Sequence, residues 1–248
     1  MFAGQRQEAI LEIVEEKGSV TLRDLVEALG TSESTIRRDL NELEERGALK
    51  RVFGGATALG TRKNIAEEAV SRRMEITADE KRRIGACAAA LIEPNDFVFL
   101  DAGTTTGAML PFLTEYSAVY VTNAVSHALE MIRRGFRVNL IGGELRAATE
   151  AIIGSSACEE LHRYNFTKCF MGTNGVDPSA GFTTPDIGEA IVKRSAMRNA
   201  QECYVLCTAD KFHVITPVSF ADLGAARIIT DRRPERWTAG PDALIIAD

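Results

Sequence analysis

The stretch SVTLRDLVEALGTSESTIRRDLNELEERGALKRVFGGA, residues 19–56, decides the fold of the N-terminal part of the chain. It contains two helical patterns separated by the short turn Gly30-Thr31-Ser32. The first pattern begins after Thr21 and the second after Ser32, and both residues are good N-caps. In the second pattern apolar residues recur at i, i+4 and i+7, which places them on one helix face: Ile36, Leu40 and Leu43. Two helices joined by a short turn that contains glycine are typical of a helix-turn-helix.

A further helix and a hairpin flank these two helices. The preceding helix has an apolar face and ends at Gly18; the face consists of Ile10, Leu11, Ile13 and Val14. After the helix end at Gly47, strand patterns over 48–52 and 56–59 flank Phe53-Gly54-Gly55. A Gly-Gly pair supplies the positive φ that a tight hairpin turn needs. We therefore expect three helices followed by a β-wing.

The face of the third helix opposite its apolar residues presents Ser34, Arg37, Arg38 and Asn41. This set combines groups that hydrogen-bond base edges with cations that bind phosphates, and it indicates DNA contact. A solvated helix explains the same face, because the spacings Arg38–Glu42 and Arg37–Asn41 permit i,i+4 pairs. Acidic residues of the helix would then cancel the local charge: Glu33, Asp39, Glu42, Glu44 and Glu45. On the pattern alone both interpretations stay open.

The rest of the chain alternates strand and helix patterns after a polar linker rich in both charge signs. The strand patterns are nearly continuous in apolar residues, as in buried parallel strands, and cover 97–101, 118–122, 137–141, 168–172, 203–208, 226–230 and 243–247. Helical patterns lie between them at 79–92, 105–114, 125–134, 155–164 and 186–200. This alternation predicts βαβ units and a doubly wound α/β domain.

Composition limits the class of protein. The 248 residues are 45% hydrophobic and 26% charged, which is ordinary for a soluble globular protein. The net charge is 29 − 35 = −6. The chain would therefore contact a nucleic acid only through a local basic patch. No apolar run has the length of a transmembrane helix, and acidic residues interrupt the apolar N-terminus, so we expect no membrane partner, no signal peptide and a cytoplasmic location. The 5 cysteines form no CxxC pair and the 3 histidines lack metal-ligand spacing, so we expect buried structural cysteines and no metal or cofactor.

Small and polar residues follow five of the predicted strands, at the sheet edge where doubly wound folds bind ligands. The segment DAGTTTG, residues 101–107, opens a helix, and its amide N–H groups and threonine hydroxyls suit a phosphate. The other segments are 122–124, 142–146, 172–175 and 208–211. Each one alone also fits ordinary turn chemistry. Together they predict a site for a phosphorylated ligand, although neither a Walker P-loop nor a GxGxxG fingerprint is present.

With these motifs in hand, the chain resembles the DeoR family of bacterial transcriptional repressors. TIRRDL at residues 35–40, with the leucine-rich helix end and the Gly-Gly wing turn, resembles the family's N-terminal domain. DAGTTT (101–106), VTNA (121–124), GGELR (142–146), GFTTPD (181–186) with Glu189 and Lys193 after it, and TADKF (208–212) resemble its sensor domain. The resemblance implies a winged helix-turn-helix domain joined to a Rossmann-like, sugar-isomerase-like α/β sensor domain. One departure is Phe53, because family members often carry His there and a polar phosphate contact is lost.

We therefore expect a DNA-binding domain over 1–58, a linker over 59–78 and a ligand-sensing domain over 79–248. The candidate DNA-binding residues are Ser34, Thr35, Arg37, Arg38, Asn41, Arg51 and Gly54. The candidate ligand-binding residues are Asp101, Gly103, Thr104, Thr105, Thr106, Asn123, Gly143, Glu144, Lys193 and Lys211. We expect the phosphate at 103–106 with Lys211 and Lys193 as cations, and sugar hydroxyls at Asp101, Asn123 and Glu144.

The resemblance implies a repressor of a sugar or sugar-phosphate operon. Its partners would be double-stranded operator DNA, a small sugar phosphate that releases it, and further copies of the chain in a homodimer or homotetramer. An isomerase-like enzyme is the alternative, because Asp101, Glu144, Glu189 and Lys211 are candidate general bases; an activator of the same architecture is another. The N-terminal 56 residues, which an isomerase does not need, favour a regulator that is not an enzyme.

Overall fold

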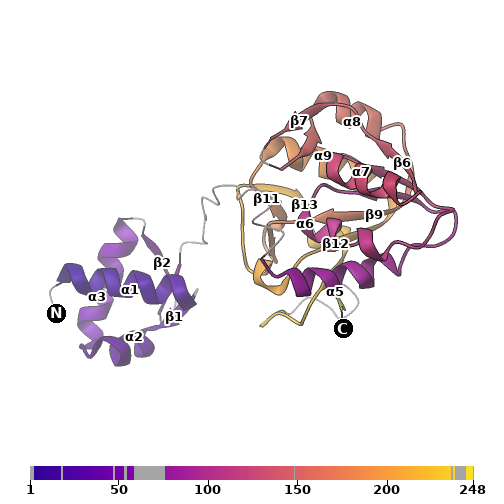
Figure 1. Cartoon of the computed structure of the whole chain (residues 1–248). Coiled ribbons are helices and arrows are strands. Elements are labelled where there is room, and N and C mark those ends of the chain that lie inside the picture. Colours follow the sequence, from indigo (N-terminus) through magenta and orange to yellow (C-terminus); the bar gives the residue numbers. More distant parts are fainter. Residues whose placement is uncertain are drawn as a thin grey trace. The chain divides into compact units, whose positions relative to one another are not determined.

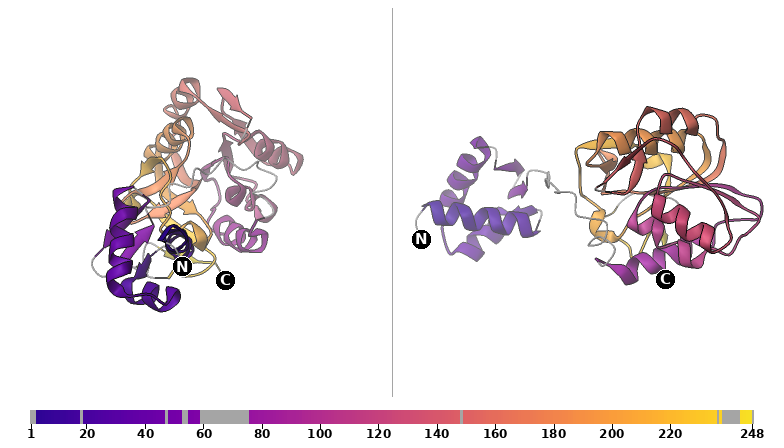
Figure 2. Two further views of the ribbon diagram at one scale, coloured as in Figure 1. Left: turned by 90° about the vertical axis from the view of Figure 1, so that its left-hand side faces the viewer. Right: turned by 45° about the horizontal axis from the view of Figure 1, so that its top comes forward.

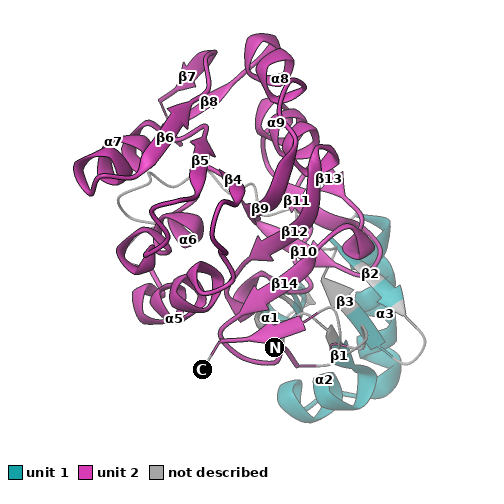
Figure 3. Cartoon of the chain, turned by 90° about the vertical axis from the view of Figure 1, so that its right-hand side faces the viewer, with its two compact units in different colours: residues 1–63 teal, residues 64–248 magenta. Residues whose placement is uncertain are grey.

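The computed structural model (Figure 1) describes residues 3–17, 19–46, 48–52, 55–58, 76–147, 149–235, 237 and 244–247. The chain divides into two compact units, residues 1–63 and 64–248, which Figure 3 shows in different colours. Each unit buries apolar side chains in cores of its own. Of the expected linker, residues 59–75 lie outside the described residues.

The N-terminal unit contains three helices and a three-stranded antiparallel sheet of order β1-β3-β2. Its elements are α1 (Ala3–Lys17), β1 (Ser19–Thr21), α2 (Leu22–Leu29), α3 (Glu33–Glu45), β2 (Leu49–Val52) and β3 (Gly55–Ala58). The three expected helices and both wing strands are confirmed. The sequence did not indicate β1, because a strand of three residues is too short to show a period.

Caps at both sides fix the turn between α2 and α3. The Thr21 hydroxyl accepts a hydrogen bond from the Asp24 N–H at 3.2 Å, and the Asp24 carboxylate accepts one from the Thr21 N–H at 3.2 Å, which begins α2. Gly30 ends α2 with φ of 60°, a conformation that glycine adopts at little cost. The Ser32 hydroxyl then accepts from the Thr35 N–H at 3.3 Å and begins α3. This geometry is a helix-turn-helix.

The second unit is built on a seven-stranded, all-parallel sheet of order β15-β14-β12-β9-β4-β5-β6. The strands are β4 (Phe97–Leu100), β5 (Val119–Thr122), β6 (Arg137–Leu140), β9 (Phe166–Gly172), β12 (Ala200–Leu206), β14 (Arg227–Thr230) and β15 (Leu244–Ile246). The expected doubly wound sheet is confirmed. The chain winds outward from β4 in one direction and returns to β9 on its other side, so the topological switch point lies between β4 and β9.

Helices cover both faces of this sheet, as Figures 2 and 3 show. They are α5 (Ala78–Ala89), α6 (Thr104–Gly107) and α7 (Val125–Arg133) on one face, and α8 (Ser155–Leu161) and α9 (Ile187–Arg198) on the other. Along β4, Val98 and Leu100 pack into the core under α5 and α7, whereas Phe99 packs into the core under α8 and α9. Burial on both faces explains why the strands are almost continuously apolar.

Two features differ from the sequence-based expectation. The helix expected over 105–114 is broken into α6 and a 3₁₀ turn (Leu110–Phe112), because Gly107 and Pro111 both disfavour a continuous helix. Two small antiparallel sheets were not expected: a hairpin of β7 (Glu144–Arg146) and β8 (Ala151–Ile153), and a sheet of β10 (Gly175–Asp177), β11 (Gly181–Thr184) and β13 (Val218–Ala221). These strands have three or four residues, which is too short for a strand period to show in the sequence.

Within the described ranges, no helix is long and apolar enough to cross a bilayer. The same residues hold no group of three or more His, Cys, Asp or Glu side chains arranged for a metal ion. Cys169 and Cys207 are buried, and Cys87, Cys158 and Cys203 are half-buried free thiols.

Candidate functional site

Helix α3 presents the residues expected to meet DNA. Its apolar side chains, Ile36, Leu40 and Leu43, are buried in the core of the N-terminal unit. The opposite face therefore points outward, and Ser34, Arg37, Arg38 and Asn41 are exposed. Thr35 is half-buried, with its hydroxyl 2.8 Å from that of Ser32.

Two acidic residues of α3 are held by α1 and do not pair with the arginines of the exposed face. The buried Asp39 carboxylate accepts hydrogen bonds from Nε and Nη2 of Arg6, at 2.5 and 3.1 Å. Glu42 accepts a hydrogen bond from the Gln7 amide at 2.7 Å. The alternative pairing of Arg38 with Glu42 is thus not formed among the described residues. Arg37 forms an exposed i,i+4 pair with Glu33 at 2.6 Å, and such pairs contribute little stability.

The wing is fastened to α3 by Arg51 of β2. Its guanidinium donates to the Asn41 side-chain oxygen, and its backbone N–H donates to the Glu44 carboxylate at 2.8 Å. Asn41 and Arg51 therefore bind each other, and the Asn41 NH2 group and the other N–H groups of the Arg51 guanidinium are not part of this bond. Phe53 and Gly54 at the tip of the wing lie outside the described residues.

In the second unit a pocket of about 120 Å³ opens at the switch point between β4 and β9. The expected residues that line it are Asp101, Gly103, Thr104, Thr105, Lys193 and Lys211. Residues outside the set of ligand-binding candidates also line it: Ile76, Thr77, Lys81, Ala102, Gly172, Thr173, Asn174, Glu189 and Thr208. The strand-end segments predicted the position of Thr173, Asn174 and Thr208, whereas nothing in the sequence pointed to Lys81 on α5.

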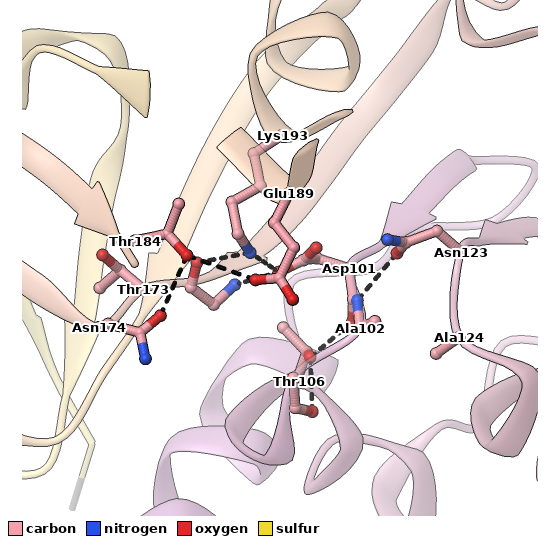
Figure 4. Close-up of polar contacts among 12 residues, drawn as sticks. Asp101, Ala102, Thr106, Asn123, Ala124, Thr173, Asn174, Thr184, Glu189 and Lys193 are labelled. Atoms are coloured by element: carbon pink, nitrogen blue, oxygen red, sulfur yellow. Dashed lines mark hydrogen bonds and ion pairs between the residues drawn. The ribbon is translucent and has the colours of Figure 1, made fainter. Parts of the chain in front are cut away.

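A buried ion pair forms the floor of this pocket (Figure 4). The Lys193 ammonium pairs with the Asp101 carboxylate and donates to the Gly172 carbonyl at 3.1 Å. The same Asp101 oxygen accepts the Gly172 N–H at 2.9 Å. Both side chains are nearly fully buried, at 4% and 2% exposure, so neither charge is available to a ligand without breaking the pair. Lys193, which was expected to bind the phosphate, and Asp101, which was expected to bind a sugar hydroxyl, thus bind each other.

Two further candidates hold the loop after β4 instead of lining the pocket. Thr106 is buried and its hydroxyl donates to the carbonyls of Asp101 and Gly103 at 2.7 and 2.9 Å. The Asn123 side-chain oxygen accepts the Ala102 N–H at 2.9 Å. Figure 4 shows both side chains turned toward that loop. The Thr106 and Asn123 side chains thus hold in place the backbone of the loop after β4, which lines the pocket.

The remaining two candidates belong to the β7–β8 hairpin. Gly143 precedes β7 with φ of 148°, and an added Cβ would lie 2.6 Å from the Ile153 carbonyl, so the hairpin requires glycine there. Glu144 is exposed and pairs in register with Ile153. The structure places neither residue in the lining of the pocket.

The cationic part of the pocket comes from Lys211 and Lys81. The Lys211 side chain is 38% exposed, and its ammonium lies 3.0 Å from Asp210. Lys81 is buried on the first turns of α5. Thr77, which precedes α5, has φ of 53°, a value that a β-branched residue rarely adopts. Positive charge and backbone amides therefore meet beside Thr104 and Thr105, where an anion is favoured.

His127 lies beneath α6 and is almost completely buried, at 5% exposure. A Cβ added at Gly107 would lie 2.8 Å from the His127 Nε2 atom, so α6 packs directly on the imidazole ring. Burial lowers the pKa of His127 to about 4, although the nearby Asp101 carboxylate opposes this shift. The imidazole is therefore neutral at pH 7.

A helix-turn-helix in the first unit and a parallel-sheet domain in the second define the class of protein as a DNA-binding transcriptional regulator. Residues 6–62 match the model of the DeoR-like helix-turn-helix domain, and residues 76–232 match the DeoR C terminal sensor domain. The chain belongs to the DeoR family of transcriptional regulators, and it binds DNA through its N-terminal domain.

Several relatives are similar over most of their length. The HTH-type transcriptional regulator FruR of Bacillus subtilis (strain 168) is 41% identical over 93% of this chain and 91% of its own. A lactose phosphotransferase system repressor of Staphylococcus epidermidis is 35% identical over 88% of this chain and 87% of its own. The regulator GlpR of Haloferax volcanii is 33% identical over 90% and 87%. Among solved structures, ribose 5-phosphate isomerase A of Methanocaldococcus jannaschii is 14% identical, with a TM-score of 0.40 over 54% of each chain.

The buried His127 makes the stability of the sensor unit depend on pH. The unfolded chain protonates this histidine below about pH 6.5, whereas the folded chain does so only near pH 4, so stability is lost as the pH falls between these values. We expect about 3 kcal/mol of unfolding free energy to be lost between pH 7 and pH 4 through this group. Denaturant unfolding followed by Trp237, which is the 1 tryptophan and lies in the second unit, measures it.

The matched variant for this prediction is His127→Gln, which cannot titrate. Every other carboxylate and histidine is unchanged, so the variant should show a smaller loss of stability over the same pH range. An identical pH slope in the wild type and in His127→Gln would contradict the assignment.

Proposed function

We propose that the protein is a repressor of an operon for sugar or sugar-phosphate metabolism, released from its operator by a phosphorylated sugar. The observation that carries the proposal is the pocket at the switch point, which joins two lysines, backbone amides and hydroxyls in a chain that belongs to the DeoR family. The name of the Staphylococcus epidermidis relative, a lactose phosphotransferase system repressor, supports a sugar-linked operon. In this proposal residues 59–78 connect a reader of DNA to a sensor.

The exposed face of α3 reads the operator in this proposal. Arg37 and Arg38 contact base edges or phosphates, with Ser34, Thr35 and Asn41 as polar neighbours. Residues of α1 hydrogen-bond the side chains of Asp39 and Glu42. This lowers the electrostatic repulsion between these carboxylates and the DNA phosphates. Arg51 and Gly54 of the wing contact the backbone of the DNA.

Replacing either arginine of α3 tests this interface. Arg37→Ala and Arg38→Ala should each weaken operator binding by about 1–3 kcal/mol and reduce sequence preference, since the exposed pair of Arg37 with Glu33 is easily broken. Arg51→Ala should weaken binding to all sequences and flatten its salt dependence. Gel shifts with the upstream region of the protein's own operon, at several salt concentrations, measure both effects.

Arg163→Ala is the matched control, because it removes one exposed arginine from the second unit. It should leave operator affinity unchanged. Unchanged affinity in both α3 variants, with circular dichroism showing an intact fold, would exclude this helix as the reader.

The effector phosphate binds at Gly103, Thr104 and Thr105 in this proposal, with Lys211 and Lys81 as cations. Lys193 serves the site indirectly, because its charge is neutralised by Asp101. The same pair argues against Asp101 as the general base of an isomerase, since a carboxylate held by an ammonium is a poor base. We propose a sensor that does not turn its ligand over.

Variants that remove phosphate contacts should bind DNA normally yet fail to respond to the effector. Lys211→Ala and Thr105→Val should each need at least about tenfold more of the inducing sugar phosphate, because each loses a hydrogen bond to a charged group. Gel shifts titrated with a panel of sugar phosphates measure the response. Thr106→Val is the contrast: it removes buried bonds to two carbonyls and should lower the unfolding free energy of the sensor unit by about 1–3 kcal/mol.

If either phosphate variant responds at the wild-type concentration, the phosphate site is elsewhere. Turnover of sugar phosphates by the purified wild type at enzyme-like rates would establish the isomerase alternative. An operon that is transcribed only when the protein is present would establish an activator.

The protein is an oligomer in this proposal, since one winged domain makes few DNA contacts and a two-fold assembly doubles them. Exposed apolar side chains on α9 and β7 offer a contact surface: Leu145, Ile187 and Ile191, at 57%, 67% and 48% exposure. We expect a homodimer or homotetramer at micromolar concentration, measured by sedimentation with and without DNA. A species of 27.0 kDa under both conditions would contradict this expectation.

A further inference from the structure

One wall of the pocket is rich in hydrogen-bond acceptors. It is formed by Glu189 in the first turn of α9 and by Asn174, which follows β9. The Asp186 carboxylate accepts the Glu189 N–H at 2.8 Å and so fixes the start of the helix. Glu189 is 9% exposed and its carboxylate is turned toward the centre of the group drawn in Figure 4.

The acceptors of this wall compete for the proton of one hydroxyl group. The Thr184 hydroxyl lies 3.3 Å from the Asn174 oxygen and 3.3 Å from the Glu189 Oε2 atom, and a single proton can be donated to only one of them at a time. The other Glu189 oxygen, Oε1, is buried without a hydrogen-bond partner among the described residues. Its ionic neighbour, the Arg146 Nη1 atom, pairs with the Asp186 carboxylate and is 3.9 Å from Glu189, which is too long for a hydrogen bond. Glu189 Oε1 can therefore accept a hydrogen bond from a ligand.

Buried acceptors without donors cost free energy, and a ligand that brings donors recovers it. The terminal torsion of a glutamate side chain has broad minima, so its carboxylate can turn to meet a ligand that enters the pocket. Lys211 and Lys81 favour an anionic group, while Glu189 favours hydroxyl groups. The pocket is thus complementary to a molecule that carries both an anionic group and hydroxyl groups.

We infer that Glu189, assisted by Asn174, is the residue that determines specificity by accepting hydrogen bonds from the hydroxyl groups of the sugar. This inference rests on the proposed function, because it presumes a sugar phosphate in the pocket. It assigns the hydroxyl-reading role to a residue that was a candidate only as a general base. In an aldose phosphorylated at its last carbon, the groups read include the hydroxyl at carbon 2.

Matched pairs of ligands test the inference in the full-length protein. The two pairs are ribose 5-phosphate with 2-deoxyribose 5-phosphate, and glucose 6-phosphate with 2-deoxyglucose 6-phosphate. Inorganic phosphate is the separate probe that has no sugar hydroxyl groups. Titration calorimetry gives each Kd for the wild type and for Glu189→Gln. Glu144→Gln is the matched control, because it removes an exposed carboxylate that does not line the pocket.

The wild type should bind a sugar phosphate at least about tenfold more tightly than its 2-deoxy partner, the effect of one hydrogen bond to a charged acceptor. Glu189→Gln should bind both members of the pair with nearly equal affinity, and its Kd for inorganic phosphate should change less than about twofold, because the phosphate end is intact. Glu144→Gln should keep the wild-type ratio.

Retention of the wild-type ratio by Glu189→Gln would overturn the inference while leaving the proposed function in place. Failure of the wild type to bind any sugar phosphate or inorganic phosphate would overturn the proposed function, and the inference with it. If Glu189→Gln does not fold, as judged by Trp237 fluorescence, Asn174→Ala takes its place: a reduced ratio supports the inference and an unchanged ratio overturns it.

Discussion

The buried pair of Lys193 and Asp101 is the interaction on which the sensor unit depends. It joins the end of β4, the end of β9 through Gly172, and the middle of α9. These three elements come from distant parts of the chain and meet at the switch point of the sheet. Removing one partner would leave an uncompensated charge in a site that excludes water, a change that costs about 3–5 kcal/mol in buried pairs. The pair therefore fixes the geometry around which a ligand is bound.

Because that pair is neutral, the charges left at its edges define what the pocket can hold. Lys81 comes from α5, Lys211 from the turn after β12, and Glu189 from α9. The N-terminal unit also contains an ion pair that neutralises a buried carboxylate, since Arg6 pairs with Asp39. Arg37 and Arg38 lie on the exposed face of α3.

The sequence predicted the parts of this structure that follow from periodicity and strong caps. Apolar runs located the strands of the large sheet, and Thr21, Gly30 and Ser32 located the helix-turn-helix. Strand ends indicated the position of the pocket because parallel strands share one carboxyl edge. Periodicity says nothing about rotamers, so it did not show that Thr106 and Asn123 turn to the backbone of their own loop. It also could not place Lys81, which reaches the pocket from a helix that packs beside it.

Ile76 and Thr77 form part of the pocket wall, and they are the first residues described after the N-terminal unit and the segment that follows it. The pocket is therefore not formed by the sheet alone, because residues that precede α5 complete its lining. This has a practical meaning for modular engineering. A hybrid regulator that joins this α/β domain to another DNA-binding domain must take its fusion point before Ile76, because a junction at the start of α5 would remove two residues of the pocket lining.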